Sequence, residues 1–207
     1  MPLDLSLYLV TDRELCAEQG LVQTVVAAVR GGVTLVQLRD KHASDAELID
    51  QARRLKAALA GTGVALIIND RLEVALASGA DGLHIGQDDG DVAQARAALG
   101  PHAILGLSVQ TREQLARLDP SALNYLGLGP VFATPSKRDH AEPLGFEGLA
   151  ELAAASPLPG VAIGGLKAEH VLPTRQAGAQ GLAVISAICG TPDPEAAARA
   201  FTRPPRH

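Results

Sequence analysis

Short apolar runs alternate with longer amphipathic segments along the whole chain. Short apolar runs bounded by turn residues are typical of buried strands, and the longer segments have the spacing of helices that bury one face. This alternation predicts successive strand–helix units and a parallel sheet. Strands are expected over residues 7–11, 33–39, 65–69, 82–86, 103–109, 123–129, 161–164 and 181–186.

The segments between these strands carry helix start and stop signals. Ser44 with Glu47, and Thr111 with Gln114, have the spacing of capping boxes. Asp193 before a proline is typical of an N-cap followed by the first helical residue. Four glycines stand where helices should end, Gly61, Gly79, Gly100 and Gly178. These signals predict the same boundaries as the apolar runs.

Eight strand–helix units indicate a barrel. A weak repeat supports this, because the sequence G-A-D-G-L at 79–83 returns as G-A-Q-G-L at 178–182, half a barrel later. A doubly wound open sheet is the alternative, but residues 11–14 (T-D-R-E) stand where its glycine-rich dinucleotide fingerprint would follow the first strand. We expect an α/β protein, a single (β/α)8 TIM barrel over residues 1–207, with a short frayed tail from about residue 202.

Composition narrows the choice of partners. The 207 residues suit one domain, and with 47% hydrophobic residues but no Trp, three Phe and two Tyr, the core must consist of Ala, Val, Leu and Ile. The net charge of -5 provides no general attraction to nucleic acid or to an anionic membrane. Any anion-binding site must therefore be local.

The two cysteines and the N-terminus bear on the compartment. Cys16 and Cys189 are too few and too far apart along the chain for a disulfide framework or a zinc site, so we expect reduced thiols. No signal peptide opens the chain, and no apolar run approaches the roughly 18 residues of a membrane span. We expect a cytoplasmic protein without membrane partners, and the sequence is compatible with a homo-oligomer.

Polar residues gather at the predicted C-terminal strand ends, where barrel enzymes build their sites. In the strand predicted over residues 33–39, alternation directs Gln37 and Arg39 into the barrel mouth, with Lys41 just beyond. Two cations and an amide suit a phosphate or diphosphate. The alternative is an ion pair at the strand end that uses Asp40, although an inward guanidinium is costly without an anion to meet.

Two aspartates follow the next two strands. Asp70 and Asp89 are each candidate N-caps of the following helix. Their joint position on neighbouring strand ends favours another interpretation, because facing carboxylates repel unless a cation lies between them. Carboxylates together with substrate phosphate oxygens usually hold Mg²⁺. We infer a Mg²⁺–diphosphate site beside Arg39 and Lys41.

The remaining strand ends add hydroxyls and glycines. Ser108 faces the mouth, and residues 129–138 interleave hydroxyls with cations, which predicts an anion-binding lid or a solvated surface loop. Gly164 and Gly165, with residues 184–188, fit the phosphate site of a barrel, where backbone N–H groups approach the oxygens; the alternative is a tight turn that needs positive φ. His84 lies inside a strand and is expected in a barrel layer rather than as a base.

Taken together, these motifs resemble the thiamine phosphate synthase family over nearly the whole chain, from Leu5 to about Phe201. The resemblance implies Mg²⁺-dependent transfer of a hydroxymethylpyrimidine group from its diphosphate to the nitrogen of hydroxyethylthiazole phosphate or its carboxylated form, giving thiamine phosphate and diphosphate. The family's reaction is dissociative, so the protein's task is to neutralise and position the leaving group.

The resemblance also implies roles for residues, taken position by position. The pyrimidine diphosphate would be held by Gln37, Leu38, Arg39, Asp40, Lys41, Asn69, Ser108 and Lys137. The catalytic groups among these would be Arg39, Lys41, Ser108 and Lys137. Mg²⁺ would be held by Asp70 and Asp89. The thiazole phosphate would be held by Thr134, Pro135, Ser136, Gly165, Ile185 and Ser186.

Two positions depart from the family's pattern. Ala133 stands for the usual proline, which loosens the loop by about 0.4–1 kcal/mol, and Ser136 stands for threonine, which removes a methyl worth at most about 0.8 kcal/mol. Two alternatives share the barrel: a thiazole tautomerase and a non-catalytic sensor of thiazole phosphate. Neither would need Mg²⁺, so Asp70, Asp89 and Lys137 favour the synthase.

Overall fold

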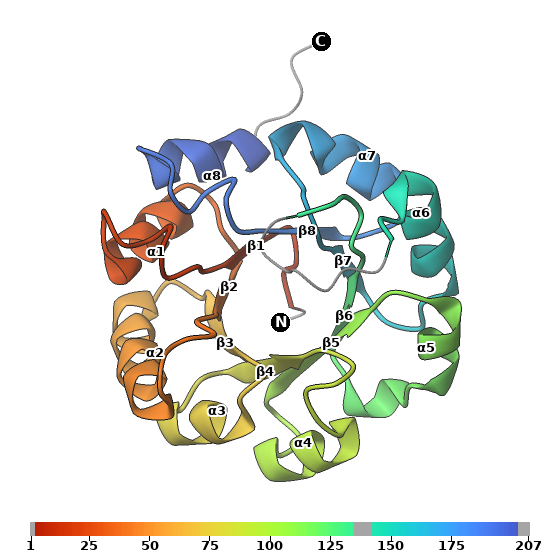
Figure 1. Ribbon diagram of the computed structural model, residues 1–207, viewed down its shortest axis with the longest axis horizontal. Coiled ribbons are helices and arrows are strands. Elements are labelled where there is room, and N and C mark those ends of the chain that lie inside the picture. Colours follow the sequence, from red (N-terminus) through yellow and green to blue (C-terminus); the bar gives the residue numbers. More distant parts are fainter. Residues whose placement is uncertain (1–2, 135–141, 203–207) are drawn as a thin grey trace.

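The computed structural model describes residues 3–134 and 142–202. Within these residues, eight strands are all parallel and close into one barrel, in which β1 pairs with both β2 and β8. The helices form an outer ring around the strands in chain order (Figure 1). The predicted (β/α)8 barrel is confirmed, and the doubly wound alternative is wrong.

The strands are β1 (Leu7–Val10), β2 (Leu35–Leu38), β3 (Ala65–Asn69), β4 (Gly82–Ile85), β5 (Ile104–Val109), β6 (Tyr125–Leu128), β7 (Gly160–Ala162) and β8 (Gly181–Val184). The α-helices are α1 (Leu21–Arg30), α2 (Asp45–Leu59), α3 (Leu72–Ser78), α4 (Val92–Leu99), α5 (Arg112–Arg117), α6 (Gly145–Ala155), α7 (Val171–Gln176) and α8 (Pro194–Thr202). Two 3₁₀ turns are η1 (Pro120–Ala122) and η2 (Ala168–His170). The tail predicted from about residue 202 lies outside the described residues beyond Thr202.

Six of the strands end one or two residues earlier than predicted, while β3 and β5 end as predicted. The end of β2 shows the reason. The backbone N–H of Arg39 donates to the Thr11 hydroxyl over 3.0 Å instead of continuing the strand ladder. The last polar residue of the predicted strand therefore belongs to the loop that follows it.

The predicted helix caps are confirmed. Ser44 with Glu47, and Thr111 with Gln114, both form complete capping boxes. The Asp193 carboxylate accepts the N–H of the third residue of α8 over 2.9 Å. Local signals thus define where these helices begin.

The repeat before β4 and β8 has a steric basis. Gly79 and Gly178 both follow a helix with positive φ, 70° and 91°. Gly82 and Gly181 begin the two strands, and a Cβ at either position would lie 2.0 Å from a backbone oxygen of the adjacent segment. Only glycine allows the chain to pass this closely at both places.

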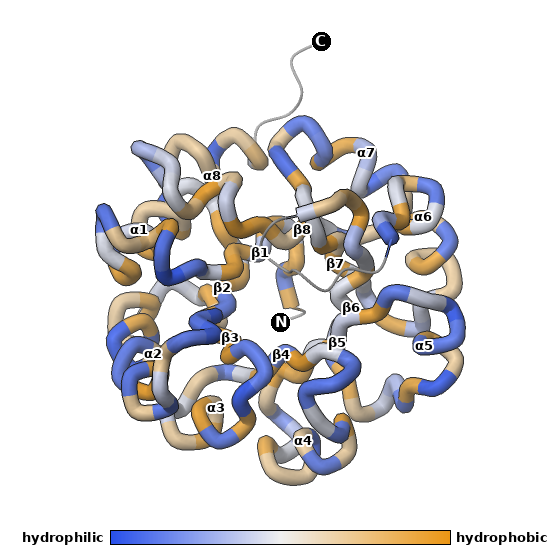
Figure 2. The backbone as a smooth tube through the Cα atoms, in the orientation of Figure 1, coloured by the Kyte–Doolittle hydropathy of each residue, from blue (hydrophilic) through white to orange (hydrophobic). Residues whose placement is uncertain are grey.

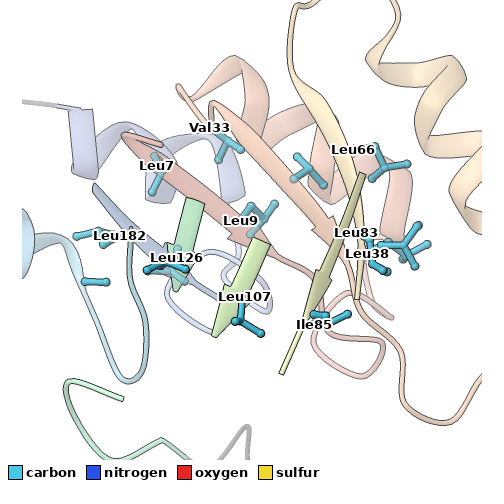
Figure 3. Close-up of a cluster of buried hydrophobic side chains, with 14 of the residues drawn as sticks. Leu7, Leu9, Val33, Leu38, Leu66, Leu83, Ile85, Leu107, Leu126 and Leu182 are labelled. Atoms are coloured by element: carbon cyan, nitrogen blue, oxygen red, sulfur yellow. The ribbon is translucent and has the colours of Figure 1, made fainter. Parts of the chain in front are cut away.

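Two cores lie on the two faces of the closed sheet. The outer core fills the space between strands and helices, with side chains such as Leu9, Leu83, Leu107 and Leu126 (Figure 3). Along the helical ring, hydrophobic and hydrophilic stretches alternate, as expected of helices with one buried face (Figure 2).

The inner core fills the barrel itself with Tyr8, Leu35, Ile67, Tyr125 and Val161, among others. Neither tyrosine is more than 1% exposed. Strand alternation places these residues inside, because every second side chain faces the barrel axis.

The two thiols are neighbours in space. Cys16 and Cys189 are both free and buried, and a hydrogen bond from Cys189 lowers the pKa of Cys16 to about 7. The closure of β1 against β8 explains this contact, since it brings the two ends of the chain together. Their wide separation along the chain therefore says nothing of their separation in space.

The inner core yields a prediction about Gly106 on β5. A Cβ at Gly106 would lie 2.2 Å from Cζ of Tyr125, whereas one at Gly127 would meet its nearest atom only at 3.3 Å. We expect Gly106→Ala to lower the free energy of unfolding by about 1–3 kcal/mol through overpacking, and Gly127→Ala to cost less than about 1 kcal/mol. Urea denaturation of both variants measures this, and equal losses would contradict it.

Candidate active site

Gln37 and Leu38 lie next to each other on β2 but face different environments. Gln37 points into the barrel, where its Nε2 donates to the Tyr8 hydroxyl over 2.6 Å. Leu38 packs in the outer core, so only its backbone is available to a ligand at the mouth. Arg39 follows directly and is half-buried. The inward direction predicted for Gln37 is confirmed, although its amide is buried against Tyr8. The predicted direction of Arg39 into the mouth stays a prediction.

Asp40 shapes the loop after β2. Its Oδ1 accepts the backbone N–H groups of His42 and Ala43 over 2.9 and 3.1 Å. Its Oδ2 lies 3.5 Å from Nη1 of Arg13, which comes from the loop after β1. An ion pair at this strand end therefore exists, as the alternative interpretation expected. The role of Asp40 in substrate binding stays a prediction.

Asp70 and Asp89 interact directly at the ends of β3 and β4. Burial, followed by the hydrogen bond and the charge of Asp89, raises the pKa of Asp70 to about 6, against the opposing effects of Asn69 and Lys41. Asp70 has a φ of 61°, in the left-handed region that Asp and Asn tolerate better than most residues. The interaction of Asp70 with Asp89 shows that the two carboxylates are neighbours, as the sequence predicted.

Neither aspartate caps a helix. The N-cap of α3 is Arg71, which makes no side-chain capping bond, and the N-cap of α4 is Asp91, whose carboxylate accepts the N–H of Gln94. Asp89 instead accepts the backbone N–H of Gly86 over 2.8 Å. The N-cap alternative is therefore wrong for both.

A pocket of about 210 Å³ opens beside these carboxylates, lined by Asp40, Lys41, Asn69, Asp70 and Arg71. Arg71 was not among the predicted site residues. Its Nη1 donates to the Ala43 carbonyl over 2.7 Å and to the Asp45 carboxylate over 2.9 Å. Arg71 therefore ties the loop that carries Lys41 to the end of β3. The only sequence signal for it was its place directly after Asn69-Asp70.

A chain of polar side chains crosses the barrel below the mouth. His84 Nδ1 lies 2.8 Å from the Tyr125 hydroxyl, and His84 Nε2 lies 2.9 Å from Oγ of Ser108. The Tyr125 hydroxyl lies 2.8 Å from that of Tyr8, which in turn accepts from Gln37. The expected place of His84 in a barrel layer is confirmed. The tyrosines were missed, although they are the only two in the chain and fall on inward strand positions.

The glycine pair follows β7 on the opposite side of the mouth. Gly164 and Gly165 have positive φ, 94° and 63°. A Cβ on Gly165 would lie 2.8 Å from the Ala133 carbonyl oxygen, so the loops after β6 and β7 pack closely here. The tight turn of the alternative interpretation is present. The phosphate-binding role of Gly165 stays a prediction.

Of the other residues predicted on this side, the structure describes Thr134, Ile185 and Ser186. Ser186 is exposed just after β8, and Ile185 accepts the N–H groups of Ile188 and Cys189 in the turn that follows. Thr134 is half-buried at the end of the described loop. Pro135, Ser136 and Lys137 lie outside the described residues, as does Arg138, the last residue of the predicted lid.

Comparisons with known proteins identify the family of the chain. The sequence model of a family described as thiamine monophosphate synthase matches residues 7–188. The chain belongs to this family. It is 55% identical to the thiamine-phosphate synthase of Psychrobacter sp. over 197 residues, covering 94% of this chain and 92% of that one. It is 54% identical to the thiamine-phosphate synthase of Azorhizobium caulinodans, over 96% and 93% of the two chains.

The fold comparison agrees with the thiamine monophosphate synthase family. A solved thiamine phosphate pyrophosphorylase from Pyrococcus furiosus superposes with a TM-score of 0.87 at 33% identity, covering 97% of this chain and 95% of that one. Members of the family are transferases of thiamine biosynthesis, and this chain is such an enzyme. In the described part of the chain, no helix has the length and apolarity to cross a membrane.

The raised pKa of Asp70 predicts a pH effect in the metal-free protein. A carboxyl whose pKa is higher folded than unfolded destabilises the fold once it ionises, so this cost grows from about pH 4 and is complete above about pH 6. Asp70→Asn, which tolerates the same φ, should therefore be more stable than the parent by up to about 3 kcal/mol at pH 8 and equally stable near pH 3.

Urea denaturation in EDTA across this pH range measures the difference. Asp88→Asn is the control, since it removes the same charge from an exposed position of the loop after β4. Parallel pH profiles for Asp70→Asn and the parent would contradict the interpretation of the pair.

Proposed function

We propose that this chain forms thiamine phosphate by Mg²⁺-dependent transfer of hydroxymethylpyrimidine from its diphosphate to hydroxyethylthiazole phosphate or its carboxylated form. The observation that carries the proposal is the contact between Asp70 and Asp89 at neighbouring strand ends, beside Lys41. Two carboxylates so placed disfavour a bare anion and favour a divalent cation that brings the anion with it.

The donor set fits Mg²⁺. Asp70 and Asp89 supply hard carboxylate oxygens, and this ion is usually held by one or two carboxylates together with substrate phosphate oxygens and water. Burial, followed by the hydrogen bond and the charge of Asp89, raises the pKa of Asp70, and the positive charge of a bound cation would favour the ionised carboxylate. When bound, Mg²⁺ supplies positive charge to the leaving diphosphate.

The chain's own residues supply the rest of the leaving-group site. Arg39 and Lys41 stand at the end of β2, and Lys137 is assigned to the same anion by position in the family. A charge pair at about 4 Å contributes about 4 kcal/mol at an effective dielectric of 20, before desolvation. Several such cations stabilise a departing diphosphate without any protein nucleophile.

The second substrate is assigned to the opposite side of the mouth. Gly165, with Ile185 and Ser186, would hold the phosphate of the thiazole, together with Thr134, Pro135 and Ser136. The positive φ of Gly165 and its lack of a side chain support this, because bare backbone allows N–H groups to approach phosphate oxygens. Two anion sites facing each other across one mouth would bring the thiazole nitrogen to the pyrimidine carbon.

The proposal places the reaction in the cytoplasm, with phosphorylated small molecules as ligands. Nucleic acid and membranes have no part in it. The tautomerase and sensor alternatives need no divalent cation, so a metal requirement separates them from the synthase.

Turnover tests the proposal directly. Purified protein given both substrates and Mg²⁺ should make thiamine phosphate and diphosphate, and EDTA should stop the reaction until excess Mg²⁺ restores it. Chromatography of the products measures this. Absence of product with fresh substrates, or turnover unaffected by EDTA, would overturn the proposal.

Asp89→Asn is the sharpest single substitution. The amide oxygen can still accept the Gly86 N–H, so the loop is kept while the charge is lost. We expect turnover to fall about a hundredfold or more with little change in melting temperature. Asp91→Asn is the matched control, because it removes the same charge two residues away and keeps the N-cap of α4. Equal turnover of the two variants would contradict a metal role for Asp89.

A further inference from the structure

A continuous hydrogen-bond chain through the barrel interior connects Gln37 and Ser108, two of the residues predicted to bind the pyrimidine diphosphate. It runs from Gln37 on β2 to Tyr8 on β1, Tyr125 on β6, His84 on β4 and Ser108 on β5, with successive distances of 2.6, 2.8, 2.8 and 2.9 Å. The four members other than Ser108 are at most 7% exposed. Buried polar atoms must be satisfied within the protein, so each proton in this chain has a defined place.

The amide of Gln37 fixes the direction of the chain. Its Nε2 can only donate, so the Tyr8 oxygen accepts from it and the Tyr8 proton goes to Tyr125. Burial raises the pKa of Tyr8 and Tyr125 well above the ordinary value, so both remain protonated phenols.

The same direction continues through the histidine. Because Tyr125 accepts from Tyr8, its own proton goes to Nδ1 of His84. A neutral imidazole whose Nδ1 accepts carries its proton on Nε2, which then donates to Oγ of Ser108. The hydroxyl proton of Ser108 is thereby directed away from His84.

We infer that Tyr8, Tyr125 and His84 are positioning residues that hold Ser108 as a hydrogen-bond donor toward the pyrimidine diphosphate. Ser108 is the second-last residue of β5 and is half-buried, whereas the three rings are buried, so Ser108 is the member of the chain most accessible to a ligand. With the reverse direction, Ser108 would donate to His84 and present only lone pairs to an anionic ligand. The inference rests on the proposed function for the identity of that ligand, but the direction of the chain does not.

Two glycines make room for this layer of rings. A Cβ at Gly106 would lie 2.5 Å from the Tyr125 hydroxyl oxygen, and one at Gly127 would lie 3.3 Å from Cε1 of His84 and 3.5 Å from Oγ of Ser108. The tyrosine rings also pack edge to face, with centroids 5.9 Å apart. The barrel interior therefore holds the hydroxyls in the positions that the chain requires.

Nitrogen-15 NMR of the full chain with labelled histidine tests the direction without any substrate. Among the signals of the six histidines, that of His84 is identified as the one that disappears in His84→Gln. The inference expects His84 as the neutral Nε2–H tautomer near neutral pH. The Nδ1–H tautomer, or an imidazolium, would overturn it.

A double-mutant cycle tests the positioning role. Tyr125→Phe removes the proton that Nδ1 accepts, and we expect kcat to fall about tenfold, the equivalent of one buried hydrogen bond, with KM changed much less. In the Ser108→Ala background, Tyr125→Phe should lower kcat almost no further, because the hydrogen-bond chain acts through Ser108. Full additivity, or an unchanged kcat in Tyr125→Phe, would overturn the inference.

The control is Leu126→Val, the next residue on β6, which faces the outer core. It should lower the melting temperature while leaving kcat within about twofold of the parent, because it removes packing without breaking any bond of the hydrogen-bond chain. If the parent enzyme makes no thiamine phosphate, the proposed function fails, and the NMR result still decides the direction of the chain.

Discussion

The interior of an eight-stranded barrel is only wide enough to be filled by side chains, and this constraint determines what the mouth can present. Here the filling includes two buried tyrosines and His84. Gly106 leaves room beside Tyr125, and Gly127 leaves room beside His84. The tyrosine hydroxyls join Gln37, His84 and Ser108 into one layer. That layer lies inside the barrel and includes Gln37 and Ser108, two of the residues predicted to bind substrate. A polar layer is stable in a barrel core only because every member has a partner.

At the strand ends, charge determines the division of the mouth. Asp70 and Asp89 interact at the ends of β3 and β4, and Lys41 and Arg71 line a pocket together with Asp70. Arg71 is engaged by the loop after β2 and by Asp45, so its role is to hold that loop in place. The side formed by β7 has left-handed glycines and close backbone packing in place of carboxylates. The two halves of the mouth therefore differ in charge and in backbone conformation.

The sequence predicted the features that depend on local order. Strand alternation placed Gln37 inside the barrel, and the capping boxes at Ser44 and Thr111 marked where helices begin. It could not predict partners that meet only when the barrel closes. Asp40 pairs with Arg13 from another strand end, Cys16 meets Cys189 across the β1–β8 seam, and Tyr8 meets Tyr125 across the axis. Periodicity identifies the face on which a residue lies, but not the residue that it meets there.

Asp70 and Asp89 are proposed to bind a diphosphate only through a divalent cation. Calorimetric titration of inorganic diphosphate into the protein, with Mg²⁺ and then with EDTA, tests this most directly. The account predicts binding with Mg²⁺, weak or absent binding with EDTA, and loss of the Mg²⁺ effect in Asp70→Asn. Equal affinity with Mg²⁺ and with EDTA in the parent protein would contradict it.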